Sequence, residues 1–449
     1  MEKKYKYLIL TFGCQMNKSD SERLSFVLER MGLEITYNEK DADVIIINTC
    51  SVRESAEARI YSKTSNLSKL KKKKPSLIVG VTGCMPGRDK DGKIKKRLKS
   101  IDLFFPIAEM THLPARLMQL NPNLRAMDNV EEDYLRLRPN YQKAYQAFIP
   151  IQTGCNQFCT YCVVPYARGL EINRPLKNIL DEIKVVVEKG CLEITLLGQI
   201  VNHYKAPDPE NFSDNNLYKK NDFAKLLWEV NQIEGVKRLD WPAPHPVYFD
   251  EELLDALTLP KQINYIHLPV QSGNNEILQK MNRRYTREYY IDLVKRIKEK
   301  RPACAGRPEI AIATDIIVGF CGETKEQFQD TVDLYKECDF DVAYPAKYSA
   351  RSGTLADKIF EDDVSQDEKK RRWFELQNLL VENTREKNKK YLNQTLSVLV
   401  DSFRNGWCAG ISSEMKRVTF KGSEDLIGTI QNIEIFKTDV WMMWGRCIT

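Results

Sequence analysis

Short apolar runs alternate with amphipathic stretches along most of the chain, and this alternation predicts the secondary structure. Near the start, three uninterrupted and largely β-branched runs have the character of buried parallel strands. They are Tyr7–Thr11, Val44–Asn48 and Leu77–Thr82. Ser19 and Glu22 match a capping box, which predicts a helix that reaches Met31 and stops at Gly32. Strands that alternate with helices favour an α/β domain over residues 5–121.

The alternation resumes after a polar, proline-punctuated stretch at 122–140, which is interpreted as a linker. Six further apolar runs predict strands with helices between them. These runs are Ala147–Gln152, Glu193–Leu197, Lys237–Asp240, Tyr265–Leu268, Ile310–Val318 and Asp341–Tyr348. Six βα units favour a partial (βα)6 barrel over a doubly wound sheet, in a domain of residues 141–388. Capping boxes at Thr324 and Ser365 predict the starts of two of its helices.

The last segment, residues 389–449, has the pattern of a small β-barrel. Its β-type runs are Leu396–Val400, Arg417–Phe420 and Ile430–Phe436, and its expected glycine turns are Gly406, Gly410, Gly422 and Gly428. Basic residues and loop aromatics on such a barrel suit single-stranded or loop RNA. The candidates are Arg404, Lys416, Arg417, Lys421, Phe403 and Trp407. An ordinary solvated surface with core aromatics explains the same residues equally well.

Composition adds limits to this picture. The chain has 449 residues, with 68 basic and 62 acidic side chains and a net charge of +6. This mild excess is not typical of a strongly basic nucleic-acid protein, so RNA affinity has to come from local patches. The basic runs Lys71–Lys74 and Lys93–Arg97 are more typical of solvated faces. With neither a signal peptide nor an apolar run of about 18 residues, the chain is expected to be cytoplasmic, with its 12 cysteines reduced.

The run TGCNQFCTYC carries Cys155, Cys159 and Cys162 with the spacing C-x3-C-x2-C and no fourth cysteine nearby. A [4Fe–4S] cluster normally takes four thiolates, so three would leave one iron without a protein ligand. An open iron can bind a cofactor, and S-adenosylmethionine (SAM) fits it through its amino and carboxylate groups. A structural zinc site would need a second cysteine pair, which is absent here. The motif lies just past the first central strand, at the rim where barrel chemistry occurs.

Three more cysteines follow predicted strands at equivalent places. Cys14, Cys50 and Cys84 each come two or three residues after a strand of the first domain. Ligands of open α/β sheets gather outside the carboxyl ends of the strands, so these thiols are expected to converge on one rim. Each alone would be interpreted as a small core residue. Together they predict a second three-thiolate cluster site.

The chain resembles the MiaB-type tRNA methylthiotransferases, within the radical-SAM enzymes, over nearly its whole length. The first segment shows GCQMNKSDSER and NTCSVRE. The centre shows GCNQFCTYCVVPYARG, TLLGQIVN, HLPVQSGNNEILQKMNRRYTREYY and TDIIVGFCGET. The resemblance implies an α/β chain with an N-terminal methylthiotransferase domain, a radical-SAM barrel and a TRAM-like RNA-binding β-barrel at the C-terminus.

The resemblance also implies two [4Fe–4S] clusters and SAM as cofactors. Cys155, Cys159 and Cys162 would hold the cluster that binds SAM, and Cys14, Cys50 and Cys84 an auxiliary cluster. Tyr161 matches the aromatic position beside the SAM adenine. The strand-end residues Gln199, Gln271, Ile317, Gly319 and Glu323 match regions around SAM. No side chain is assigned as a catalytic acid or base, because a radical made from SAM breaks the C–H bond in this chemistry.

The implied reaction is methylthiolation of C2 of N6-isopentenyladenosine next to the anticodon in tRNA. VVPYARG, LLGQ-x-VN and NTCSVRE favour this branch of the family. The alternatives are a sister enzyme acting on threonylcarbamoyl-adenosine or a ribosomal protein, and a non-catalytic cluster-bearing RNA-binding protein. Expected partners are the tRNA anticodon stem-loop, an electron donor such as flavodoxin or ferredoxin, and a sulfur source, with no membrane and a monomeric chain.

Several residues depart from the family pattern near strand ends that face substrate. They are Ile200, His203, Cys321, the run Ser349–Thr354 and the run Trp241–His245. These departures bear on the choice of nucleotide and leave the cluster cysteines untouched. His245 and His267 are interpreted as hydrogen-bonded structural histidines rather than catalytic ones.

Overall fold

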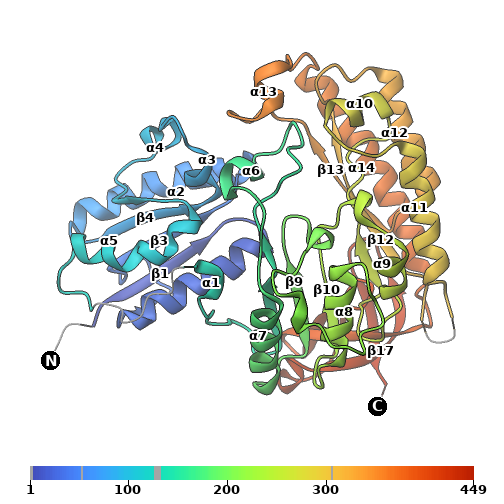
Figure 1. The fold of residues 1–449 in the computed structure, drawn as a ribbon, viewed down its shortest axis with the longest axis horizontal. Coiled ribbons are helices and arrows are strands. Elements are labelled where there is room, and N and C mark those ends of the chain that lie inside the picture. Colours follow the sequence, from blue (N-terminus) through green and yellow to red (C-terminus); the bar gives the residue numbers. More distant parts are fainter. Residues whose placement is uncertain (1–3, 52–53, 126–132, 305–306, 449) are drawn as a thin grey trace.

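The computed structural model describes residues 4–51, 54–125, 133–304 and 307–448. Figure 1 shows an N-terminal α/β unit in blue beside a larger central unit that runs from green to orange. The red C-terminal strands lie at one end of the central unit. The chain therefore forms the three kinds of unit that the hydrophobic pattern predicts.

The N-terminal unit is a five-stranded parallel sheet with helices on both faces. The strand order is β2-β1-β3-β4-β5. Its strands are β1 (Lys6–Thr11), β2 (Glu34–Ile35), β3 (Val44–Thr49), β4 (Ile78–Gly83) and β5 (Leu103–Phe104). Its helices are α1 (Gln15–Arg30), α2 (Glu54–Lys73), α3 (Cys84–Arg88), α4 (Lys93–Arg97) and α5 (Leu113–Leu120). The three predicted strands correspond to β1, β3 and β4, which are adjacent in the sheet.

The predicted start of the first helix at Ser19 is wrong. Helix α1 begins at Gln15, and the Asn17 side chain accepts a hydrogen bond from the Cys14 backbone N–H at 3.2 Å. Ser19 lies inside the helix, where its hydroxyl donates to the Phe148 carbonyl of the central unit. The helix is capped locally by Cys14 and Asn17, and the Ser19 hydroxyl serves the contact with the central unit instead of a cap. The stop is confirmed, since Gly32 has a φ of 81°.

The stretch predicted as a linker packs on the N-terminal unit on both sides of its undescribed part, since Leu124 is also buried in the hydrophobic core of that unit. Residues 126–132 lie outside the described part of the chain. Beyond them, Tyr134, Leu135 and Leu137 are buried in the same hydrophobic core as α1 and α5. The second half of the stretch is therefore packed on the N-terminal unit, because it supplies apolar side chains that cover the end of that core.

The central unit contains six parallel strands in two sets, β6-β9-β10 and β11-β12-β13. Its strands are β6 (Gln146–Pro150), β9 (Glu193–Leu197), β10 (Arg238–Asp240), β11 (Tyr265–His267), β12 (Ala311–Val318) and β13 (Val342–Lys347). An isolated bridge between Leu239 and Gln262 joins the two sets. All six match the predicted ranges within two residues, which confirms the partial barrel.

Helices cover the outer face of this barrel, as Figure 1 shows. They are α7 (Leu176–Glu188), α8 (Asp222–Gln232), α9 (Glu251–Ala256), α11 (Arg287–Lys300), α12 (Lys325–Cys338) and α14 (Gln366–Lys389). The short helices α10 (Asn275–Lys280) and α13 (Leu355–Ile359) lie at one end of the unit, beyond the strands. The short pair β7 (Gln152–Thr153) and β8 (Ile172–Asn173) brackets the cysteine loop and α6 (Val164–Arg168). The predicted caps at Thr324 and Ser365 are both confirmed.

The C-terminal unit is a closed five-stranded barrel of order β14-β15-β16-β18-β17. Its strands are β14 (Thr395–Arg404), β15 (Trp407–Ser412), β16 (Arg417–Lys421), β17 (Ile430–Thr438) and β18 (Met443–Cys447). β15 and β18 were not predicted, because glycines interrupt their apolar runs. Gly410 was expected in a turn but lies within β15, where a Cβ would come within 2.2 Å of the Leu399 carbonyl oxygen.

Two surface assignments on this barrel are also corrected. Lys416, expected to be exposed, is buried with its ammonium near Asp341 of the central unit. Phe403 lies in β14 and packs against the barrel core rather than in a loop. Arg404, Lys421 and Trp407 are exposed as expected. Lys416, one of the basic residues predicted for an RNA surface, is therefore part of the junction with the central unit instead.

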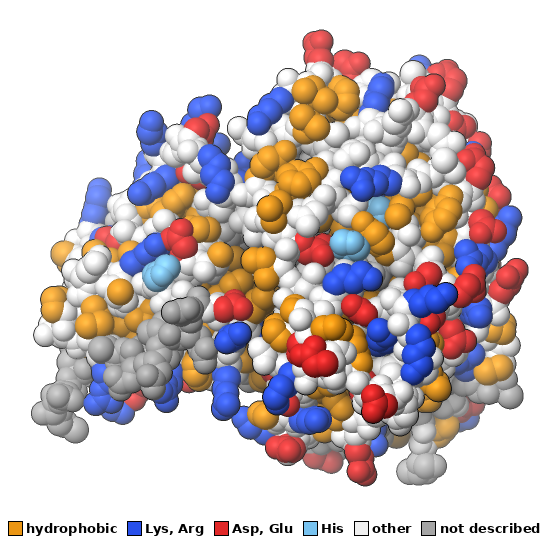
Figure 2. All heavy atoms as spheres, in the orientation of Figure 1, with side chains coloured by type: hydrophobic (Ala, Val, Ile, Leu, Met, Phe, Trp, Pro, Cys, Tyr) orange, Lys and Arg blue, Asp and Glu red, His pale blue; other side chains and the backbone are white. Residues whose placement is uncertain are grey.

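Charge is unevenly placed over the face drawn in Figure 2. Lys and Arg side chains gather over α4, where Lys93, Lys95, Lys96 and Arg97 are exposed, while both signs mix over the central unit. Within the described residues, none of the helices combines the length and apolarity that crossing a membrane requires.

Candidate cluster and S-adenosylmethionine site

The central cysteine loop follows β6 and lies at the carboxyl end of the barrel strands. Gly154 precedes it with a φ of 75°, and a Cβ there would meet the Leu170 carbonyl oxygen at 2.0 Å, so glycine is required. Hydrogen bonds from Cys155 N–H to the Gly169 carbonyl and from Cys162 N–H to the Cys159 carbonyl fold the loop back on itself. The structure thus brings the three predicted thiols together on one tight turn.

The electrostatics of these thiols agree with their closeness. Burial raises the pKa of Cys155 to about 11 and that of Cys162 to about 12, and the charge of Cys159 adds to both shifts. Such thiols stay protonated at neutral pH unless a metal takes the proton's place, because a coordinated thiol is deprotonated.

Arg283 is a functional candidate that the sequence analysis did not identify. It follows α10, and its Nη1 donates to the Cys159 sulfur at 3.4 Å. The Tyr285 ring lies 5.1 Å from the guanidinium, and Tyr285 in turn donates to the Val270 carbonyl at 2.7 Å. A cation that donates to the Cys159 sulfur would favour the electron-rich state of a cluster bound there. The Arg-Arg pair in MNRRYT was the available signal, but only the fold shows which arginine points inward.

The three N-terminal cysteines lie at the carboxyl ends of β1, β3 and β4, which are neighbours in the sheet. Cys14 caps α1, Cys50 follows β3 directly, and Cys84 begins α3. A Cβ built on Gly13 would lie 2.9 Å from the Cys50 Cβ, so the first two loops touch. Burial raises the pKa of Cys84 to about 11, and the charges of Cys50 and Cys14 are among the further causes. The structure therefore gathers this set as well.

A polar network that the sequence analysis missed holds these loops in register. The Asn17 side chain donates to the Asn48 side chain and to the Thr49 carbonyl, both at 3.1 Å. The Asn48 amide donates back to the Asn17 carbonyl at 2.8 Å. The Thr49 hydroxyl donates to the Thr82 carbonyl at 2.6 Å and accepts from the Met85 N–H. Each cysteine-bearing strand end is thus tied to the next.

Arg168 connects the two cysteine sites. It ends α6, the short helix that starts two residues after Cys162, and its side chain is 2% exposed. Its Nη2 donates to Asp20 of α1 at 2.6 Å, and its positive charge lowers the pKa of Cys84 against the effect of burial. Nη1 is buried, and a hydrogen bond from Arg168 also lowers the pKa of the Cys84 thiol. A buried guanidinium beside a cysteine suits an anionic, sulfur-rich group at that place.

Both cysteine sets fit a [4Fe–4S] cluster by the chemistry of their donors. Each offers three thiols and no fourth, and an arginine faces each set: Arg283 at Cys159 and the buried Arg168 at Cys84. Within the described residues, no three Cys, His, Asp or Glu side chains are close enough to share a single metal ion. A four-iron cluster binds each thiolate to a different iron and so spaces them more widely. The assignment of these six cysteines as ligands stays a prediction.

The residues predicted around SAM lie along the same rim. Tyr161 and Ile317 pack in one apolar cluster with Phe320, and the Tyr161 and Phe320 ring centres are 6.5 Å apart. Gln199 follows β9, and its Oε1 is buried without a hydrogen-bond partner in the described part of the chain. Gln271 has a φ of 72° and pairs with β12 through its backbone. An aromatic ring and an unpaired amide oxygen at one rim are compatible with a nucleoside ligand.

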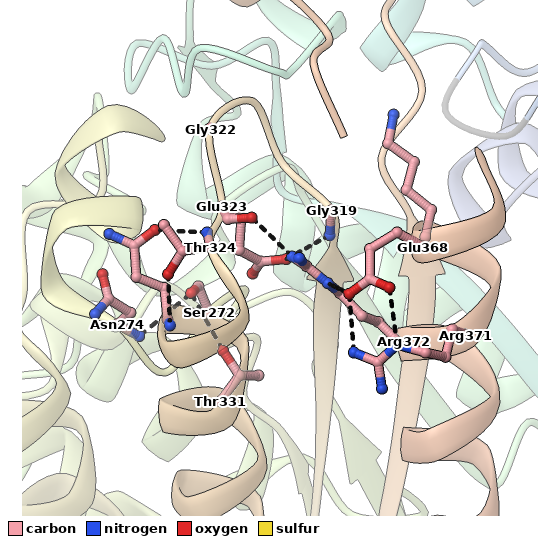
Figure 3. Close-up of polar contacts among 12 residues, drawn as sticks. Ser272, Asn274, Gly319, Gly322, Glu323, Thr324, Thr331, Glu368, Arg371 and Arg372 are labelled. Atoms are coloured by element: carbon pink, nitrogen blue, oxygen red, sulfur yellow. Dashed lines mark hydrogen bonds and ion pairs between the residues drawn. The ribbon is translucent and has the colours of Figure 1, made fainter. Parts of the chain in front are cut away.

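Gly319 and Glu323 form a closed turn after β12, which Figure 3 shows. The Glu323 carboxylate accepts from the Gly319 N–H at 2.6 Å and from Arg372 of α14 at 2.7 Å. Burial raises the pKa of Glu323, while Gly319 and Arg372 oppose the shift. Glu368 holds Arg372 from the other side. The carboxylate is thus occupied in shaping the turn, and its predicted contact with SAM stays a prediction.

The histidines among the predicted departures have structural partners. His245 Nδ1 accepts from the Val247 N–H, and burial lowers the pKa of His245 to about 2, so the ring is neutral at physiological pH. His203 Nδ1 lies 2.9 Å from the Glu171 carboxylate. The structural interpretation of His245 agrees with these contacts. Cys321 is buried in the apolar cluster with Phe320.

Comparison with known proteins places this geometry in context. The model of "Uncharacterized protein family UPF0004" matches residues 6–106, and that of the radical SAM superfamily matches residues 149–335. The chain is 39% identical over 453 residues to the tRNA-2-methylthio-N(6)-dimethylallyladenosine synthase of Thermoanaerobacter sp. (strain X514), covering 98% of this chain and 92% of that protein. The protein of the same name from Alkaliphilus oremlandii (strain OhILAs) is 39% identical over 455 residues, covering 99% and 93%.

Among solved structures, the radical S-adenosylmethionine methyltransferase TsrM from Kitasatospora setae, with tryptophan and a SAM analogue bound, has a TM-score of 0.52. It is 16% identical and covers 76% of this chain and 72% of that chain. A second structure of the same protein, with cobalamin and a [4Fe–4S] cluster bound, has a TM-score of 0.51 at 15% identity and covers 79% and 77%. At these identities the likeness shows a shared fold alone.

Proposed function

The chain belongs to the tRNA-2-methylthio-N(6)-dimethylallyladenosine synthase family, and from this premise we propose that it methylthiolates C2 of N6-isopentenyladenosine next to the anticodon of tRNA. The observation that carries the proposal is the joint presence of two three-cysteine sites connected by Arg168. A single site would suit many radical-SAM reactions. A second open cluster beside it suits a reaction that delivers sulfur as well.

The cofactors and the residues around them have separate tasks in this proposal. When bound, the two [4Fe–4S] clusters and SAM supply the one-electron chemistry that attaches a methylthio group to an unactivated C–H carbon. Cys155, Cys159 and Cys162 would hold one cluster, and the N-terminal cysteines the other. Arg283 and Arg168 offset negative charge at the two cysteine sites. The Gly319–Glu323 turn shapes the part of the rim that lies next to α14.

The expected partners follow from the same proposal. Because the proposed substrate is tRNA, we expect the protein to act in the cytoplasm and to bind the anticodon stem-loop. The exposed basic helix α4 and the exposed Trp407 of the C-terminal barrel are surfaces that suit contact with RNA. An electron donor of the flavodoxin or ferredoxin class and a sulfur source complete the set, and the chain acts as a monomer.

Nucleoside mass spectrometry tests the reaction and the substrate together. The chain is expressed in a bacterium that lacks its own tRNA methylthiotransferase, and the digested tRNA is analysed for methylthiolated isopentenyladenosine. The species should appear with the wild-type chain and be absent with Cys159→Ala. Cys447→Ala is the matched control, because Cys447 is exposed on β18 of the C-terminal barrel and belongs to neither cysteine set. It should leave the product unchanged.

The alternatives give different outcomes in the same experiment. If the precursor persists while the purified protein holds both clusters, the isopentenyladenosine assignment fails, and threonylcarbamoyl-adenosine and ribosomal protein are examined next. A non-catalytic RNA-binding protein would give no product and would bind tRNA equally well with or without Cys159. For the proposed enzyme, Cys159→Ala should abolish modification and leave tRNA binding nearly intact.

A further inference from the structure

The inner face of β11, β12 and β13 carries a polar and aromatic group that the proposed function does not use. Asp315 of β12 is paired in register with Tyr344 of β13, and His267 of β11 lies beside them. Their strand neighbours Ile266, Ile316 and Ala343 belong to the main hydrophobic core under the helices. Because side chains alternate along a strand, His267, Asp315 and Tyr344 point to the opposite face, into the barrel.

These three side chains form a connected unit. His267 Nε2 and an Asp315 carboxylate oxygen are 2.9 Å apart, and the His267 and Tyr344 rings stack with their centres 5.5 Å apart at an angle of 23°. The hydrogen bond fixes the carboxylate and the imidazole, and the stacking fixes the tyrosine ring. The unit is therefore organised before any ligand arrives, which reduces the entropy cost of binding.

The unit is also open to solvent. Tyr344 is 47% exposed, and the Asp315 side chain is 41% exposed. On neighbouring strands, the inward-facing Thr195 and Asp240 are buried. A tyrosine ring that is stacked on a histidine and about half exposed, beside a partly exposed carboxylate, suits recognition of a nucleobase.

The unit lies deeper along the strands than Ile317 and Tyr161, two of the residues predicted to lie near SAM. Ile317 follows Asp315 by two residues on β12 and pairs with Ala346, whereas Asp315 pairs with Tyr344. At about 3.3 Å per residue, this places the Tyr344 level about 7 Å deeper along the strands. Tyr161 packs with Ile317 at the upper level. A base on Tyr344 would thus occupy a position separate from the adenine of SAM.

We propose that Tyr344 is the stacking platform for the target adenine of the tRNA, and that Asp315, held by His267, accepts the N6–H of that base. This inference rests on the proposed function, since it names the residues that receive its substrate. N6-alkylated adenine keeps one N6–H, so a carboxylate can still accept a hydrogen bond from the alkylated base. His267 acts as a positioning residue, and Tyr344 and Asp315 as binding residues.

Binding of a fluorescent anticodon stem-loop to the anaerobic holoprotein tests the platform. Two RNAs are compared: one carries N6-isopentenyladenosine at the target position, and the other is abasic there. Tyr344→Ala and Tyr344→Leu should each weaken binding of the first RNA by roughly 5- to 150-fold, the usual range for loss of one stacked base. They should leave binding of the abasic RNA within about twofold of wild type. Tyr344→Phe keeps the ring and should bind both RNAs as wild type does.

Controls separate a lost base contact from a damaged protein. Tyr37→Ala changes a tyrosine that is 87% exposed on the N-terminal unit and should change neither affinity. An RNA whose N6 carries a second alkyl group lacks the N6–H, and Asp315→Ala should bind it and the isopentenyl RNA alike. The proposal is overturned if Tyr344→Ala weakens both RNAs equally, weakens neither, or if the wild-type protein does not distinguish the abasic RNA.

Failure of the proposed function would look different. In that case the wild-type holoprotein would give no methylthiolated product from the isopentenyl stem-loop, whatever its affinity. Product formation together with identical behaviour of wild type and Tyr344→Ala would retain the function and remove the platform. The two conclusions are therefore decided by separate measurements on the same samples.

Discussion

Neutralising Asp20 should loosen the N-terminal unit from the central barrel. Asp20 of α1 and Arg168 of α6 form an ion pair of 2.6 Å, with side chains 1% and 2% exposed. Removing one partner of such a buried pair typically costs about 3–5 kcal/mol, because the other charge stays buried without compensation. Asp20→Asn keeps the shape and removes the charge, so it isolates this effect.

The magnitude translates into a measurable change in melting. At about 1 °C per kcal/mol for a chain of 449 residues, a loss of about 3–5 kcal/mol lowers the melting temperature by about 3–5 °C. The drop should be larger in the apo protein than in the holoprotein, because cluster thiolates at Cys84 would give Arg168 a second anionic partner. Calorimetry on both forms measures the shift. Hydrogen exchange of α1 and α6 shows where the structure opens.

Two controls decide whether the reasoning holds. Asp181→Asn breaks the exposed i,i+4 pair with Lys177, whose side chains are 53% and 65% exposed, and should leave the melting temperature unchanged. Asp20→Leu combined with Arg168→Met removes both charges and should recover much of the lost stability. If Asp20→Asn melts like Asp181→Asn, the buried pair does not hold the two units together, and the reasoning is refuted.

Two other variants test local electrostatics. Arg283→Gln should make the midpoint potential of the SAM-binding cluster more negative in an electron-paramagnetic-resonance titration, because a donor to the Cys159 sulfur is lost; Arg284→Gln, at the exposed neighbouring position, should not. An equal shift in both variants would mean that Arg283 acts only through overall charge. Burial raises the pKa of Asp240 from 3.8 to about 7, so its charged form destabilises the fold increasingly as pH rises from about 4 to 7. Asp240→Asn should therefore stabilise the protein by about 3 kcal/mol more at pH 8 than at pH 5 in thermal melts, and a gain independent of pH would contradict this assignment.

The hydrophobic pattern predicts much of the architecture, because each buried strand of a parallel sheet is a continuous apolar run in the sequence. The runs at Val44–Asn48 and Glu193–Leu197 are buried on both faces, and each became a strand with nearly the predicted bounds. The cysteine spacing is equally local, since three thiols on one loop need no long-range information to be recognised. Even the convergence of Cys14, Cys50 and Cys84 follows from the rule that parallel strands end on one rim.

Contacts between distant segments decided the rest. The Ser19 hydroxyl does not cap α1 but bonds to the Phe148 carbonyl of the central unit, 129 residues away in sequence. Lys416 is buried because the C-terminal barrel docks near Asp341. The roles inferred for Arg168, Arg283 and Tyr344 depend on which of many similar side chains point inward. A local pattern indicates which helix or strand a segment can form. The burial and pairing of its charged side chains depend on the surfaces that pack against it, and only the folded chain specifies these surfaces.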